Sequence, residues 1–430
     1  MKDKISKLIN VFKKDGFSKT ILKTLRYFKA NYLSKINFIA ILDVKYHQEE
    51  YVQQLTDIFN AHYDRIIVWR GNFGWNVSLY QRPQHVALEL AKQKCLVLYE
   101  VTTFTDNVKT IQKVQENLYL VNFNNKEYAK LIFNALNELN KPKYLQIYST
   151  QWQISLAELK KYISLGYKVI YEYIDELSAD IIGTKQLPQN IIDKFEYCLK
   201  DTKNVYVVAT ADKLYQDIQN KRGQNKLIFS TNGVDYEFFQ NFNNYHVDEE
   251  FKEIIANGKI NIGYYGALAK WVDYELLRKI SQTNKYNILL FGSKYDDSYD
   301  NSKIDNEENI YYLGVRDYKV LKFYAKNIDI LTIPFLINDI TKSTSPLKLF
   351  EYMALHKPIV STNINECRKY QSVFVAKSKK AFLESLELAY SHKDDKRYIK
   401  LLDKEAKENS WTSKVEAITK VLESDEKDLL

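Results

Sequence analysis

Residues 341–362, TKSTSPLKLFEYMALHKPIVST, decide the fold of the second half of this chain. Ser345 is a good helix N-cap because its hydroxyl accepts a hydrogen bond from an orphan backbone N–H, and Pro346 suits the first helical position, where no N–H is needed. Pro358 ends the helix, and PIVS (358–361) predicts a short buried strand. Together with an upstream strand at 328–335, the pattern predicts a strand–loop–helix–strand unit whose positive helix start suits a phosphate.

The helix that follows Pro346 has two different sides. A rotation of 100° per residue places an apolar arc on one side, formed by Leu347, Leu349, Phe350, Met353 and Ala354. Lys348 and Glu351 fall opposite this arc, where they are neighbours and where we expect them to be exposed. They form either an ordinary solvated face or a ligand-binding face. The second is favoured by the many hydroxyl groups of the preceding loop: Thr341, Ser343, Thr344 and Ser345.

On both sides of this unit, short β-branched or aromatic strands alternate with helices. The clearest strands of the first half are residues 65–69, 95–100, 118–123, 144–149, 168–174, 204–209 and 227–230. After a polar stretch at 238–259, strands return at residues 260–265, 287–291, 310–313, 328–335, 358–361 and 373–376. This alternation predicts βαβ units with largely parallel sheets. We therefore predict an α/β chain of two doubly wound, Rossmann-like domains that face each other across a cleft.

With 430 residues, the chain exceeds the usual size of a single core, so we expect two domains. The predicted division is a basic amphipathic arm at 1–34, an N-terminal domain at 35–235, a C-terminal domain at 236–395 and C-terminal helices at 396–430. Ser410-Trp411 predicts a break before the last helix.

The arm at 1–34 carries two apolar stripes surrounded by lysines, Ile5-Leu8-Ile9-Phe12 and Ile21-Leu22-Leu25-Phe28. It lies either on an anionic membrane surface or against its own domain, and the pattern leaves both open.

Net charge, cysteine spacing and the distribution of apolar residues limit the classes of function to be considered. The net charge of +8 is mild for this length and does not favour a nucleic-acid partner. The three cysteines, Cys95, Cys198 and Cys367, lie far apart without a metal or redox spacing, which predicts a reducing cytoplasm. The sequence contains no run of 18 apolar residues, the length that would predict a membrane span. The N-terminus lacks the apolar block of a secretory signal.

Three further loops carry candidate residues. GNFGW (71–75) follows the first clear strand and leads to Gln81 and Arg82, whose guanidinium could meet a phosphate or carboxylate; an ordinary turn is the alternative. Asp175 and Glu176 follow another strand and either accept a proton from a hydroxyl nucleophile or cap the next helix. GYYGALAKW (263–271), which contains Gly266 and Lys270, suits a diphosphate.

Several common motifs are absent from the sequence. Neither G-x-x-x-x-G-K-[ST] nor G-x-G-x-x-G occurs, so a P-loop NTPase and a dehydrogenase are not favoured. The six histidines are scattered without a ligand spacing, and we predict no obligatory metal.

The chain resembles bacterial two-domain glycosyltransferases of the GT-B fold, close to family 4 of the glycosyltransferases. The resemblance rests on WRGNFGWNVSLYQRPQHVALELA (69–91), VIYEYIDELS (169–178), INIGYYGALAKWVDYELL (260–277) and TKSTSPLKLFEYMALHKPIVST (341–362), with support from NGVDYEFF (232–239) and ENSWTSKVEAI (408–418). Within that group it is most similar to enzymes of surface-polysaccharide or teichuronic-acid assembly.

The resemblance implies a role for each candidate residue. The second half would bind a nucleotide-diphosphate sugar, with Glu351 on the ribose; Ser343, Thr344, Ser345, Lys348, Gly266 and Lys270 would complete the donor site. The first half would bind the acceptor, with Gly74, Trp75 and Gln81 in an acceptor-side loop and Asp175, Glu176 and Arg82 as catalytic residues.

Two positions depart from the family pattern. Ser343 stands where a second glutamate is usual, and Ala267 stands where an arginine is usual. Both departures concern the donor sugar or diphosphate, so donor identity and stereochemistry stay open.

The function implied is a metal-independent, hexosyltransferase-like glycosyltransferase that needs no cofactor. Its donor would be a nucleotide sugar, with UDP favoured, and its acceptor a glycan or polyprenyl-linked glycan of the cell envelope. We expect a cytoplasmic protein, peripheral at the inner face of the membrane. The alternatives are a non-catalytic GT-B-fold binding or chaperone partner and a sugar-nucleotide epimerase, because a fold alone does not decide function.

Overall fold

The computed structural model describes residues 38–71, 73–77, 80–101, 106–179, 186–242 and 245–427. The chain divides into two compact units. The first unit comprises the described residues of Met1–Val77, Leu90–Ile147 and Gln153–Ile170, and the second those of Ser78–Glu89, Tyr148–Trp152 and Tyr171–Leu430. The predicted arm at 1–34 lies outside the described residues, and the predicted domain boundaries stay predictions.

An eight-stranded sheet has the order β3-β4-β2-β1-β5-β6-β7-β8. Its strands are β1 (Arg65–Trp69), β2 (Cys95–Glu100), β3 (Ile111–Gln115), β4 (Leu118–Val121), β5 (Lys143–Tyr148), β6 (Lys168–Tyr173), β7 (Val205–Ala209) and β8 (Leu227–Phe229). Strand β1 pairs in parallel with β2 and with β5, and β7 pairs in parallel with β8. The sequence did not predict β3, which pairs antiparallel with β4 at the edge, because IQKVQ is half exposed and has no apolar run.

Helices precede and alternate with the strands of the first half. They are α2 (Phe38–Tyr46), α3 (Gln48–Phe59), α4 (Arg82–Lys92), α5 (Lys126–Glu138), α6 (Leu156–Ser164), α8 (Gln189–Lys200) and α9 (Asp212–Arg222). Local chemistry explains two of the starts. The side chains of Asn125 and Ser155 accept hydrogen bonds from backbone N–H groups at the N-termini of α5 and α6.

A six-stranded sheet in the second unit has the order β11-β10-β9-β12-β13-β14, and every pair in it is parallel. Its strands are β9 (Ile260–Tyr265), β10 (Tyr286–Phe291), β11 (Ile310–Gly314), β12 (Ile330–Ile333), β13 (Ile359–Thr362) and β14 (Val373–Ala376). In sequence order this is 3-2-1-4-5-6, the order of a doubly wound nucleotide-binding sheet. The predicted fold class, two parallel-sheet α/β domains, is therefore confirmed.

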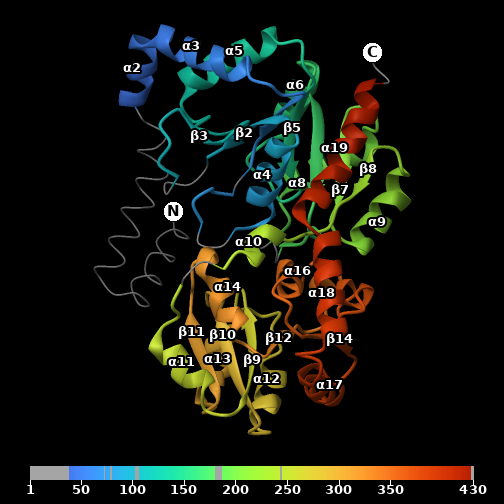
Figure 1. The fold of residues 1–430 in the computed structure, drawn as a ribbon. Helices are drawn as coiled ribbons and strands as arrows, with labels where there is room; N and C mark the ends of the chain where they lie inside the picture. The colour runs from blue at the N-terminus through green and yellow to red at the C-terminus, as the bar shows by residue number, and fades with distance from the viewer. Residues whose placement is uncertain are drawn as a thin grey trace, which may run out of the picture. The chain divides into compact units, whose positions relative to one another are not determined.

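The helices of the second half surround this sheet and continue to the C-terminus (Figure 1). They are α10 (Tyr236–Gln240), α11 (Glu249–Ile255), α12 (Tyr274–Ser281), α13 (Ser298–Ser302), η3 (Ile304–Asn306), α14 (Tyr318–Lys326), α15 (Asp339–Lys342), α16 (Leu347–Ala354), η4 (Glu366–Lys369), α17 (Lys379–Ser391), α18 (Lys396–Glu408) and α19 (Trp411–Lys427). Aspartates cap α10, α11, α12, α14 and α18 through their carboxylates.

The last two helices belong to different parts of the second unit. Helix α18 packs against α16, and α19 packs against β8. The predicted break at Ser410-Trp411 separates them, and there Val234 forms a parallel bridge with Ser410.

Candidate active site

Strands β9 and β12 are neighbours at the point where the strand order of the second sheet reverses. The loops at the carboxyl ends of two such strands diverge, which leaves room for a ligand. Here the loop after β9 contains Gly266 and Lys270, and the loop after β12 leads through Ser343 and Ser345 into α16. The predicted donor residues therefore come together at the position where a doubly wound sheet binds nucleotides.

The start of α16 differs from the predicted one. Helix α16 begins at Leu347, and Pro346 occupies the N-cap with an extended ψ of 119°. Ser345 therefore lies one residue before the cap, so the prediction that it caps the helix is wrong. Its side-chain oxygen is buried and has no hydrogen-bond partner among the described residues, and its carbonyl accepts a hydrogen bond from Asn232 Nδ2 at 2.6 Å.

Glu351 is buried, with 6% of its surface exposed, so the expectation of an exposed, solvated position is wrong. The reason is that other elements surround α16: it contacts β13, α10 and α18, and the hydroxyls of Tyr265 in β9 and Tyr318 in α14 lie near the Glu351 carboxyl. An apolar arc predicts which side of a helix faces a sheet, but it does not predict that another helix covers the opposite side.

Burial perturbs both charged groups of α16. Loss of water raises the pKa of Glu351 to about 7, although the Tyr265 hydroxyl and the Lys348 ammonium act in the opposite direction. Loss of water also lowers the pKa of Lys348 to about 8, against the attraction of Glu351. The two side chains are not within ion-pair distance of each other. A buried carboxylate and a half-buried ammonium with perturbed pKa values on one helix are typical of a ligand site.

Lys348 lies against the loop that follows β9. A Cβ atom placed on Gly266 would come within 3.0 Å of Lys348 Nζ. The ammonium also lies 5.1 Å from the Tyr264 ring centroid and 5.0 Å from that of Phe335, which is within cation–π range. Only a glycine at position 266 therefore leaves room for the lysine at the carboxyl end of β9.

The other predicted donor residues, Ser343, Thr344 and Lys270, differ from one another in burial and in hydrogen bonding. Ser343 is buried at 2% exposure, and its hydroxyl donates to Glu176 Oε2 at 3.1 Å. Thr344 is half-buried, and its N–H bonds weakly to the carbonyl of Thr341. Lys270 has an exposed side chain, and its backbone N–H donates to Asp296.

The two acids after β6 have different surroundings. Glu176 forms an ion pair with Lys213 at 2.6 Å. Asp175 makes no hydrogen bond or ion pair with another described residue, and burial raises its pKa to about 7. Helix α8 has Pro188 at its N-cap, but Ala179, three residues after Glu176, is itself helical, so the capping alternative stays a prediction. Asp175 therefore has the pKa of a general base near neutral pH.

Arg82 meets a carboxylate, as the sequence allowed, but this carboxylate belongs to the protein. Its Nε donates to Glu172 at 2.9 Å, and its other nitrogens donate to the Thr231 carbonyl at 2.9 Å and to Ser230 Oγ at 3.2 Å. Arg82 is 4% exposed and Glu172 fully buried. Its catalytic role stays a prediction, and the geometry indicates a positioning role.

The acceptor-side loop is held by an acid that the sequence did not single out. The backbone N–H groups of Trp75 and Asn76 both donate to Asp106 Oδ1, at 3.0 and 2.7 Å. Trp75 is buried, and its ring packs edge-on against Tyr99. Gly74 is buried beside it, whereas Gln81 is half-buried and its N–H donates to the Gln84 side chain.

Sequence reasoning also missed Tyr265 and Asn232. The Tyr265 hydroxyl influences Glu351 and is buried without a hydrogen-bond partner among the described residues. Nothing in the pattern marks Tyr265, because it reads as the last residue of an ordinary strand. Asn232 begins the NGVD stretch that carries the resemblance, which is the only signal that pointed to it.

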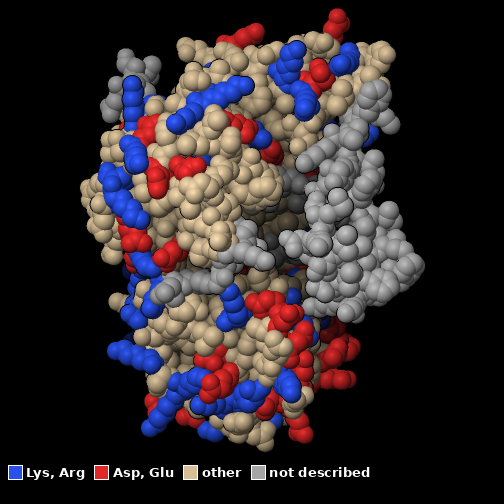
Figure 2. Space-filling view, turned by 180° about the vertical axis from the view of Figure 1, so that it is seen from behind, with Lys and Arg blue, Asp and Glu red and all other residues tan. Residues whose placement is uncertain are grey.

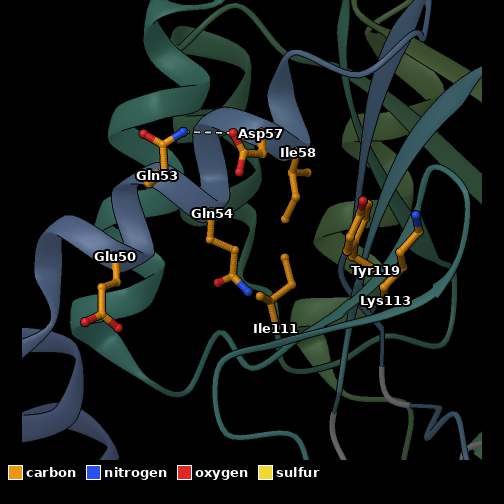
Figure 3. Close-up of a pocket in the computed structure, with 8 residues that line it drawn as sticks. All are labelled: Glu50, Gln53, Gln54, Asp57, Ile58, Ile111, Lys113 and Tyr119. Atoms are coloured by element: carbon orange, nitrogen blue, oxygen red, sulfur yellow. Dashed lines mark hydrogen bonds between the residues drawn. The ribbon is translucent and has the colours of Figure 1, made fainter.

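A pocket of about 600 Å³ lies elsewhere, in the first unit (Figure 3). Side chains of α3, β3 and β4 line it: Glu50, Gln53, Gln54, Asp57, Ile58, Ile111, Lys113 and Tyr119. None of the predicted site residues is among them. Gln53 Nε2 donates a hydrogen bond to Asp57 Oδ1 at 2.8 Å, one turn further along α3.

In the described part of the chain, no three histidine, cysteine or acidic side chains gather in a way that could hold a metal ion. No helix of that part is both long enough and apolar enough to cross a membrane. Cys95, Cys198 and Cys367 are buried, and none of them forms a disulfide with another described residue. Basic and acidic side chains are interspersed over the coloured part of the face in Figure 2.

Comparison with solved structures shows which fold the chain has. Sucrose-phosphate synthase from Thermosynechococcus elongatus superposes with a TM-score of 0.62 at 11% identity, over 84% of this chain and 98% of that one. Anabaena HepE, solved in complex with UDP, gives 0.59 at 11% identity, over 84% and 100%. The glycosyltransferase WaaG gives 0.55 at 12% identity, over 83% and 99%. The chain has the GT-B fold of these proteins.

The sequence of the second unit matches a protein-family model. Residues 259–391 match the family model described as "Glycosyl transferases group 1". The chain is also 24% identical over 266 residues to the "Putative teichuronic acid biosynthesis glycosyltransferase TuaH" of Bacillus subtilis (strain 168). That match covers 57% of this chain and 64%, less than two thirds, of the relative. The resemblance to GT-B glycosyltransferases of the family 4 type is thereby confirmed.

Proposed function

We propose that this chain transfers a sugar from a nucleotide-diphosphate donor to a glycan or lipid-linked acceptor in cell-surface polysaccharide synthesis. One observation carries the proposal: the buried Glu351 carboxylate and the Lys348 ammonium lie at the switch point of a doubly wound sheet, inside the matched glycosyl transferases group 1 domain.

On the donor side, Glu351 would accept hydrogen bonds from the ribose hydroxyls, because a carboxylate takes two donors side by side. The diphosphate would lie at the start of α16, near the unpaired Ser345 hydroxyl and the Lys348 ammonium, with Thr344, Gly266 and Lys270 around it. As the sugar–phosphate bond breaks, negative charge grows on the leaving diphosphate. Helix N–H dipoles and a fixed cation stabilise that charge.

On the acceptor side, Asp175 would accept the proton of the attacking hydroxyl. Its carboxyl group has no competing partner among the described residues, and a pKa of about 7 suits a base at neutral pH. Arg82, with its buried bonds to Glu172, Thr231 and Ser230, would hold the neighbouring backbone in place.

Three finer proposals rest on relatives and on composition. A UDP-linked donor is supported by the structures of Anabaena HepE in complex with UDP and with UDP-glucose. A role in the cell envelope is supported by the name of the Bacillus subtilis relative. A cytoplasmic protein bound to the inner membrane face through residues 1–34 is supported by the lysine-flanked apolar stripes of that arm.

The test is a binding and turnover panel on the full chain with UDP, UDP-glucose and other nucleotide sugars. A bound nucleotide present at 100 times its Kd stabilises the folded state by about 2.7 kcal/mol, which a melting curve resolves. UDP release with sugar hydrolysis or transfer supports the proposal. Binding without turnover indicates the non-catalytic partner, and an epimerised sugar released with the nucleoside diphosphate indicates the epimerase.

A further inference from the structure

A second carboxylate, that of Glu176, contacts the loop that leads into α16. Glu176 Oε2 accepts a hydrogen bond from the Ser343 hydroxyl at 3.1 Å and pairs with Lys213 Nζ at 2.6 Å. Glu176 and Ser343 are 167 residues apart in the chain, and both lie in the second unit. The position of this carboxylate is therefore set by two other segments and not by its own loop.

The two oxygens of Glu176 differ in their surroundings. Oε2 is held on both sides, whereas Oε1 has no hydrogen-bond partner among the described residues. The side chain is 38% exposed, although the Ser343 that anchors it is only 2% exposed. One oxygen is thus anchored on a buried residue while the other remains accessible to a ligand.

Charge decides which part of a donor this oxygen suits. A carboxylate repels a diphosphate, and Lys213 only partly neutralises it. The same oxygen is a strong acceptor for hydroxyl groups, because hydrogen bonds to an ionised acceptor are stronger than neutral ones. Its natural partner beside the helix start is the uncharged, hydroxyl-bearing sugar.

We propose that Glu176, anchored by Ser343 and Lys213, binds a hydroxyl of the donor's sugar and distinguishes a nucleotide sugar from the free nucleoside diphosphate. This deepens the proposed function and rests on it. The proposal gives the two acids after β6 different roles: Asp175 accepts the proton of the acceptor hydroxyl, and Glu176 binds the donor sugar.

Titration calorimetry with UDP and with UDP-glucose tests this division on the full chain. Glu176→Ala should weaken UDP-glucose binding about tenfold or more, the loss expected for one hydrogen bond to a charged group. It should not weaken UDP binding, because it removes a charge that repels the diphosphate. The isosteric Glu176→Gln should reproduce the direction with a smaller loss and keeps the site filled if the alanine variant folds poorly. Glu416→Ala is the matched control, because Glu416 also pairs with a lysine, Lys420 at 3.2 Å, on α19.

The outcomes separate the inference from the proposed function. Equal losses for UDP and UDP-glucose would make Glu176 a structural link, and unchanged affinities would leave it without a role; either result overturns the inference alone. If the unmodified chain binds neither UDP nor any nucleotide sugar of the panel, the proposed function fails and the inference fails with it.

Discussion

The carboxyl group of Glu351 is buried and has little contact with water. In the unfolded chain this group ionises near pH 4.5, whereas in the folded chain its pKa is about 7. Between these values the folded state holds the extra proton, so the stability that this group contributes falls as the pH rises from about 4.5 to 7. Above pH 7 the folded chain retains a buried negative charge, which is unfavourable unless a ligand hydrogen-bonds to it.

Replacing Glu351 by glutamine should therefore have opposite effects on binding and on stability. We expect Glu351→Gln to weaken UDP binding by roughly 1.5–3 kcal/mol, the value of hydrogen bonds to a charged group. At pH 8 the same variant should melt at a higher temperature than the unmodified chain. Calorimetry and a melting curve at one pH measure both effects. Unchanged UDP affinity would show that Glu351 does not contact the nucleotide.

Asp175 gives the second prediction at this scale, and it concerns the pH dependence of turnover. A base with a pKa of about 7 is ionised above that pH, so kcat/KM should rise through pH 7 and then level off. Asp175→Asn should remove this rise and lower transfer at least about a hundredfold, the usual contribution of a general base, with little change in UDP affinity. If UDP affinity falls as far as turnover does, Asp175 is a donor-side or structural residue.

At the scale of elements, β9 and β10 end in a close approach of two backbones. Gly292 has φ of +140°, and a Cβ atom there would lie 1.8 Å from the carbonyl oxygen of Gly266. The Gly266 N–H meanwhile donates to the Phe291 carbonyl at 2.9 Å. The loop that receives Lys348 is thus shaped by the neighbouring strand as well as by its own sequence.

Gly292→Ala should destabilise the chain by more than about 3 kcal/mol, because backbone strain of about 1–3 kcal/mol adds to a steric overlap that no side-chain rotation relieves. Gly223→Ala is the control: φ there is +78°, but a Cβ atom meets nothing within 4 Å. Urea unfolding of both variants isolates the overlap from the strain. Equal losses of stability would mean that the two backbones separate at little cost.

At the scale of the whole molecule, Arg82 connects segments that are far apart in the chain. Its guanidinium bonds to residues 90, 149 and 148 positions away, namely Glu172, Thr231 and Ser230, and lies 5.8 Å from the Trp411 ring centroid. Every one of these residues is buried. This network joins the start of α4, β6, the end of β8 and the start of α19.

Arg82→Met should cost about 3–5 kcal/mol of stability, since it removes the arginine from a buried ion pair and leaves the Glu172 carboxylate buried. The double variant Arg82→Met with Glu172→Gln should recover a large part of this loss, because it removes the uncompensated charge. Denaturant unfolding of the three proteins measures the difference. A double variant no more stable than the single one would show that the bonds to Ser230 and Thr231, and not the ion pair, carry the effect.

The sequence pattern was sufficient to predict most of the strands and their order along the chain. Strands such as Arg65–Trp69 and Val373–Ala376 have the predicted bounds, because the apolar and β-branched runs that predict them are local. Strand Ile111–Gln115 escaped prediction since an edge strand buries little and needs no apolar run. The alternation of strands and helices also determined the parallel sheets, because parallel neighbours require crossover connections.

Only the tertiary structure decided the environments of the site residues. The motif named Glu351, yet its burial depends on residues of other elements, such as Tyr265 of β9 and Tyr318 of α14, which the period of one helix cannot encode. The motifs likewise named Glu176, Ser343 and Arg82, but not that Glu176 bonds to Ser343 or that Arg82 is bound by Glu172. The physical reason is range: propensity and periodicity act over a few residues, whereas desolvation and ion pairing depend on which distant segments fold against one another.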